Sequence, residues 1–107
     1  MMKKIYFRKK GEETIHDAEL LTKRVKKIRI DSDGKVLSFT VVPNNEYILK
    51  KFENTLFEED EFEIWIIDDD YKKSAIYSKG RLIMIEEISD DLYSFEVLLI
   101  GELAHRR

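Results

Sequence analysis

The chain of 107 residues has no cysteine and a formal net charge of −3, with 43% hydrophobic residues. This length predicts a single domain over 1–107, large enough to bury a core without disulfides or metals. The lack of cysteine excludes disulfides, thiolate metal sites and a cysteine nucleophile. No apolar run approaches the roughly 18–20 residues that a membrane span needs, and the basic start lacks the apolar stretch of a secretory signal. We therefore expect cytoplasmic synthesis and no membrane partner.

Charge is divided unevenly along the chain. Residues 1–35 carry 11 basic and 6 acidic residues (net +5), whereas residues 36–107 carry 8 basic and 16 acidic residues (net −8). Such a division favours charge matching within the fold or between copies of the chain. It disfavours a uniformly basic nucleic-acid binder, so we predict no nucleic-acid partner.

The first part of the chain predicts a strand, a weak helix and a hairpin. Apolar residues alternate over 3–8, which is typical of a strand with one buried face. Thr14 and Asp17 have the spacing of a capping box, so a short helix is expected over 15–23, with a loop and turn as the alternative. Two strands, 26–30 and 35–42, flank a turn at 31–34 in which Gly34 supplies the positive φ.

The main helix is predicted over about 45–57. Asn44 or Asn45 suits its N-cap, and Glu46 suits the positive end of the helix dipole. Its apolar residues recur at helical spacing and should cover a sheet: Ile48, Leu49, Phe52, Leu56 and Phe57.

The region from 61 to 101 predicts further strands. These are 61–67, 73–78, 81–88 and 92–100, separated by an acidic run, a turn at 78–80 and a turn at 89–91, with a short tail after Gly101. The expected class is α+β, a mostly antiparallel sheet or a small β-barrel or sandwich of about six to seven strands.

One face of these strands is apolar throughout, and the second face is apolar only at one end. Alternation places Leu82 and Met84 on one face, and Ile83 and Ile85 on the other. A second apolar face needs a covering segment or another protein. The candidate interface comprises this end of the second face and the neighbouring acidic run: Trp65, Ile67, Ile83, Ile85, Leu98, Ile100, Asp68, Asp69 and Asp70.

The sequence shows no complete catalytic or metal-binding pattern. His16 and His105 are too few for a zinc site, so we interpret them as structural or solvated. Asp31 to Gly34 superficially resembles a calcium loop, but a strand follows where further ligands should stand. The basic run 23–29 and the acidic run 68–70 are interpreted as solvated surface. We therefore predict no enzyme, no metal and no cofactor.

The order of features from Val36 onwards resembles a known family. Ser38-Phe39-Thr40-Val41 precedes a helix, Glu63-Ile64-Trp65-Ile66 follows it, and later strands contain Gly80-Arg81-Leu82 and Tyr93-Ser94-Phe95-Glu96-Val97. This order is similar to the β-barrel domains of phage tail hub and baseplate proteins and of the related spike proteins of contractile injection systems. Residues 1–35 have no counterpart in that pattern. The resemblance implies a structural subunit without catalysis that assembles into rings or tubes in a virion.

Two functions follow as hypotheses. The first is a structural or assembly protein, a phage or prophage tail or baseplate component that self-associates or docks on partner subunits. The alternative is a small acidic inhibitor or adaptor, such as a phage-encoded anti-defence protein, that binds a basic site on a partner enzyme.

Overall fold

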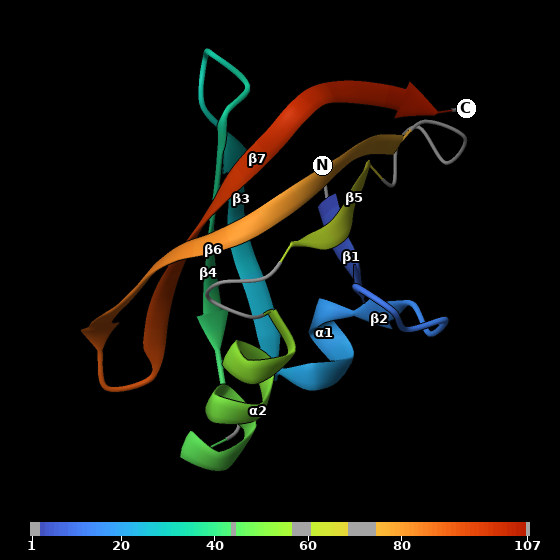
Figure 1. The fold of residues 1–107 in the computed structure, drawn as a ribbon. Coiled ribbons are helices and arrows are strands. Elements are labelled where there is room, and N and C mark those ends of the chain that lie inside the picture. Colours follow the sequence, from blue (N-terminus) through green and yellow to red (C-terminus); the bar gives the residue numbers. More distant parts are fainter. Residues whose placement is uncertain (1–2, 44, 57–60, 69–74, 107) are drawn as a thin grey trace.

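Seven antiparallel strands form one sheet in the computed structural model, which describes residues 3–43, 45–56, 61–68 and 75–106. The strands stand in the order β2-β1-β5-β6-β7-β4-β3 (Figure 1). The α+β class and the mostly antiparallel sheet are confirmed, and an open sheet is the form found. The elements are β1 (Lys3–Lys9), β2 (His16–Asp17), α1 (Ala18–Leu21), β3 (Arg24–Ile30), β4 (Val36–Val42), α2 (Glu46–Leu56), β5 (Phe62–Asp68), β6 (Ala75–Ser89) and β7 (Leu92–Arg106).

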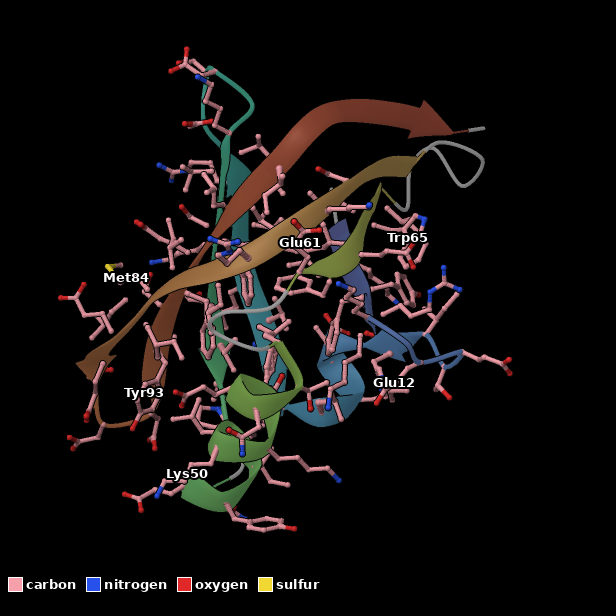
Figure 2. The ribbon with its side chains drawn as sticks, in the orientation of Figure 1. Glu12, Lys50, Glu61, Trp65, Met84 and Tyr93 are labelled. Atoms are coloured by element: carbon pink, nitrogen blue, oxygen red, sulfur yellow. The ribbon has the colours of Figure 1, made fainter. Side chains whose placement is uncertain are left out.

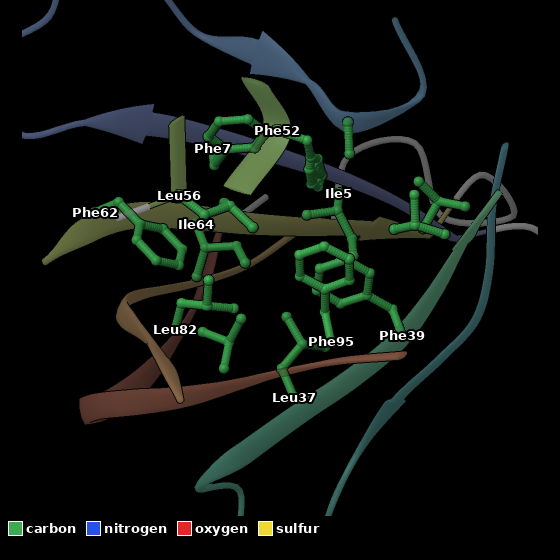
Figure 3. Packing of buried hydrophobic residues seen from close by; sticks show 14 of the residues in the cluster. Ile5, Phe7, Leu37, Phe39, Phe52, Leu56, Phe62, Ile64, Leu82 and Phe95 are labelled. Atoms are coloured by element: carbon green, nitrogen blue, oxygen red, sulfur yellow. The ribbon is translucent and has the colours of Figure 1, made fainter. Parts of the chain in front are cut away.

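The sheet is strongly curved, and the core lies on its concave side, between β1 and β5 on one side and β4 and β7 on the other; α2 adds Phe52 and Leu56 to this core (Figure 3). Phe52 of α2 is fully buried, and its ring centroid lies 5.8 Å from that of Phe7, 6.2 Å from that of Phe39 and 5.2 Å from that of Phe95. These three rings come from β1, β4 and β7. β4 and β7 are neighbours, whereas β5 and β6 lie between β7 and β1, so one side chain joins distant parts of the sheet. The predicted main helix is confirmed, with a buried stripe of Leu49, Phe52 and Leu56. Phe57, which was predicted to extend this stripe, lies outside the described residues.

The predicted hairpin around Gly34 is confirmed. The Asp31 carboxylate accepts hydrogen bonds from the backbone N–H groups of Lys35 and Val36, at 2.7 and 3.1 Å, and Gly34 has φ +70°. The bond from Val36, followed by that from Lys35, holds the pKa of the Asp31 carboxyl below its usual value. The Asp31 carboxylate therefore organises the predicted hairpin turn.

The predicted helix over 15–23 is wrong in extent, and the predicted capping box is wrong. His16 and Asp17 pair with β1 as the short strand β2, which leaves a single helical turn, α1. The N-cap is Asp17 itself, whose side chain accepts a hydrogen bond from the Glu19 N–H at 2.9 Å. The apolar stripe was too thin to sustain a longer helix, because only Ala18 in this turn is buried.

The predicted turn at 78–80 is also wrong, because β6 continues without interruption through Gly80. A Cβ at Gly80 would lie 2.7 Å from Cγ1 of Val97 and 3.2 Å from two ring carbons of Phe62. This glycine therefore permits close packing in the sheet and does not mark a turn. The expected tail after Gly101 is wrong as well, since β7 extends to Arg106 and pairs with the start of β6.

Candidate functional site

The candidate site is the convex face of the sheet, called here the outer face. Its side chains alternate along each strand with buried ones, as Trp65 does between Ile64 and Ile66. The buried residues of both helices belong to the core on the concave side, so neither helix covers the outer face. The outer face includes Tyr6, Arg8, Val36, Glu63, Trp65, Ile67, Lys79, Arg81, Leu98 and Ile100.

Trp65 lies at the centre of an ordered group on β1 and β5. It stands directly opposite Tyr6 in the register of the two strands. The Arg8 guanidinium lies over its ring, 5.7 Å from the centroid, and the Arg8 Nε donates a hydrogen bond to the Glu63 carboxylate. At a partly exposed position such a cation–π contact contributes about 0.5–1 kcal/mol. Together the ring and the carboxylate hold Arg8 in one orientation beside the half-buried Trp65.

Most of the predicted interface residues lie on the outer face, but they do not form one apolar patch. Trp65 and Ile67 lie on β5, whereas Leu98 and Ile100 lie on β7, with β6 between these strands. Two strand spacings amount to roughly 10 Å. Lys79 and Arg81 of β6 stand directly beside Ile100 and Leu98. The surface is therefore mixed, with apolar side chains interleaved with basic ones.

Ile83 and Ile85 do not share a face, which corrects the predicted alternation. The register of β6 against β7 shifts between Leu82 and Met84, as a β-bulge there requires. Ile83 is consequently 48% exposed, whereas Ile85 pairs with Phe95 and packs against the core. The extra residue of the bulge turns the Ile85 side chain toward the core, and strict alternation along the strand does not predict this change.

The acidic run extends from the end of β5. Asp68 is the last residue of that strand and pairs through its backbone with Lys3. Asp69 and Asp70 lie outside the described residues. Their part in an interface stays a prediction.

A second acidic group lies at the turn between β6 and β7, away from Trp65 (Figure 2). Burial raises the pKa of the Tyr93 hydroxyl above its usual value, and four carboxylates raise it further: Glu87, Glu46, Asp90 and Asp91. This end of the molecule therefore carries a concentrated negative charge.

Two grooves lie near the end of β1. One, of about 500 Å³, has a mixed lining that includes Arg8, Lys10, Glu61 and Lys79. The other, of about 420 Å³, lies against α2, and its described lining contains lysines and no carboxylate: Lys9, Tyr47, Lys50, Lys51, Asn54 and Thr55. Lys9 lines both grooves.

Most of the basic run 23–29 lies in β3, an edge strand of the sheet. Its lysines and arginines are exposed, and Lys27 has φ +53° where the pairing with β4 shifts register. Charged side chains and bulges at an edge strand oppose pairing with other strands. The run therefore has a structural explanation that needs no nucleic acid.

His16 has structural contacts. Its ring stacks on Phe7, with centroids 5.4 Å apart, and its Nε2 lies 2.9 Å from a Glu12 carboxylate oxygen. In the described part of the chain, no group of three or more His, Asp or Glu side chains is placed to hold a metal ion. No helix there is long and apolar enough to cross a membrane.

Sequence reasoning missed Tyr6 and Arg8 as neighbours of Trp65, and Lys9 as a neighbour of α2. The alternation over 3–8 placed Tyr6 and Arg8 on one face, but no local signal showed that β1 pairs with β5. Comparison of the sequence with known protein families and with curated proteins gives no match.

Proposed function

We propose that this protein is a non-enzymatic structural subunit that assembles with copies of itself or with partner subunits through its outer face. We further propose that it belongs to a phage or prophage tail or baseplate, made in the cytoplasm and carried into the virion. The observation that supports assembly is the group of Tyr6, Arg8 and Trp65 on a sheet face that neither helix covers.

The residue types of this group suit a protein contact. Trp, Tyr and Arg are enriched among the residues that contribute most to binding at interfaces. Because Trp65 and Glu63 already hold Arg8, its side chain would lose less conformational freedom on binding. The resemblance of the sequence features from Val36 onwards to tail and baseplate domains supports the same class of function.

Light scattering of the purified protein over a range of concentrations tests self-association. We expect a mass above that of the monomer, and a Trp65→Ser variant should weaken association by about 30-fold, since a hot-spot side chain contributes about 2 kcal/mol or more. Leu20→Ser is the matched control, because Leu20 is 84% exposed on α1 and lies off the outer face. A strict monomer at high concentration, together with no binding to products of neighbouring genes, would refute the proposal.

A second candidate, a small acidic inhibitor or adaptor, is favoured by the carboxylates around Tyr93. These would occupy a basic site on a partner enzyme. Asp90→Lys with Asp91→Lys should then abolish capture of that enzyme, whereas Trp65→Ser should leave it unchanged. The opposite pattern would exclude this candidate.

A further inference from the structure

The groove of about 420 Å³ against α2 is lined by lysines. Tyr47, Lys50, Lys51 and Asn54 follow the spacing i, i+3, i+4 and i+7, so they line one face of α2, and Lys9 approaches from the end of β1. Neither Lys50 nor Lys51 forms an ion pair with another described residue. Both are exposed, and Tyr47 beside them is 73% exposed.

The tip of the β6–β7 hairpin has the complementary chemistry. A two-residue turn, Asp90 and Asp91, joins the strands, and Ser89 pairs with Leu92 across it. Four carboxylates near the turn are exposed: Glu86, Glu87, Asp90 and Asp91. Ile88 among them is 55% exposed. Figure 1 shows this hairpin end projecting from the remainder of the fold at the lower left.

We propose that the acidic hairpin tip of one copy docks in the basic groove of a second copy. The carboxylates would face Lys9, Lys50 and Lys51, and Ile88 would meet the ring of Tyr47. The volume of the groove lies within the range of about 300–1,000 Å³ in which proteins enclose small ligands, so it can receive several side chains of a hairpin tip. This inference rests on the proposed self-association.

Charge complementarity favours a second copy over nucleic acid as the occupant. The whole chain has a net charge of −3, and Glu46 precedes Tyr47 on α2, so a nucleic acid that runs past the groove would meet negative charge as well as the lysines. Nucleic-acid grooves usually combine several stacking aromatics with the basic residues, and this groove has one, Tyr47. A second copy supplies one acidic hairpin tip for each basic groove.

Sedimentation of charge-reversed variants tests the contact. A groove variant carries Lys50→Glu and Lys51→Glu, and a hairpin variant carries Glu86→Lys and Glu87→Lys. Each alone should weaken self-association at least about tenfold at low salt, and an equimolar mixture of the two should associate again. Association of the wild type should also weaken between about 0.05 M and about 0.5 M salt, because screening shortens the reach of exposed charges.

The control variant carries Lys26→Glu on the edge strand β3 and Lys23→Glu just before that strand, with the same change in net charge as the groove variant. It should associate like the wild type. Wild-type association that persists in all variants, or a mixture that does not associate, would overturn this inference and leave the outer-face proposal standing. Loss of oligonucleotide binding in the groove variant with unchanged self-association would assign the groove to nucleic acid instead. A monomeric wild type would overturn this inference, and the proposed function would then depend on binding of the outer face to partner subunits alone.

Discussion

Replacing Gly80 by alanine should destabilise the protein, because the space for a Cβ is already occupied. The new Cβ would lie 2.7 Å from Cγ1 of Val97, whose side chain is fully buried. Valine is stiff at χ1, so it cannot move aside without disturbing its neighbours. Overpacking of this kind costs about 1–3 kcal/mol, whereas removing a glycine from a strand gains about 0.5–1 kcal/mol. The net loss should be about 0.5–2 kcal/mol.

Urea denaturation of a double-mutant cycle measures this steric effect. Val97→Ala alone should cost about 2 kcal/mol, from lost apolar burial and a small cavity. In that background the conflicting methyl group is absent, so Gly80→Ala should cost about 1 kcal/mol less than in the wild type. Gly11→Ala is the control: Gly11 has φ +84° and nothing within 4 Å of its Cβ position, so its cost should not depend on Val97. A Gly80→Ala variant as stable as the wild type, or an equal cost in both backgrounds, would refute the reasoning.

Three further predictions concern the elements that position the core. Phe52→Ala should cost about 3–5 kcal/mol by urea denaturation, because the fully buried ring contacts three others, and Phe52→Leu should cost clearly less. Asn45→Ala should lower the free energy of unfolding by about 1 kcal/mol and reduce the helical circular dichroism signal, because the Asn45 side chain accepts a hydrogen bond from the Ile48 N–H at 3.0 Å. Asn45→Ser should keep most of this stability. Asp31→Asn should destabilise the protein at neutral pH. The pKa of Asp31 is lower in the folded state than in the unfolded state, where it is near 4, so the ionised carboxylate stabilises the fold at neutral pH. This stabilisation is lost as pH falls through the folded-state pKa. Thermal unfolding at pH 7 and pH 3 checks this, and an equal difference at both would contradict it.

The sequence predicted those elements whose signals are local. The hairpin at Asp31 depends on a turn glycine and a carboxylate four residues from its partner N–H, and the main helix depends on Asn45 and a regular apolar stripe. The turn predicted at Gly80 was wrong, because in the sequence a glycine that permits close packing cannot be distinguished from one that forms a turn. A glycine is needed at position 80 because of Val97, which lies 17 positions away in the sequence and on the neighbouring strand.

The candidate site was only partly predictable for the same reason. Alternation identified Trp65 and Ile67 as members of a second face, and the side chains of both are half-buried there. The strand pairing that brings Tyr6 and Arg8 to Trp65 joins residues nearly 60 positions apart, and the bulge at Ile83 is visible only in the register of β6 against β7. Local patterns define faces of strands, whereas strand order defines which faces become one surface.

The two surfaces proposed for assembly differ in the interactions that would stabilise their contacts. The group around Trp65 combines an aromatic ring with an arginine already held by Glu63, so its contribution to binding depends mainly on burial and shape. The groove against α2 and the hairpin tip carry opposite charges on exposed side chains, so their attraction depends on ionic strength. An isologous contact through the outer face closes a dimer, whereas docking of a tip into a groove is heterologous and generates a ring or a filament unless two copies exchange tips reciprocally. A subunit with both contacts would therefore form dimers that salt preserves and larger assemblies that salt dissolves, which assigns each level of assembly to a separate set of residues.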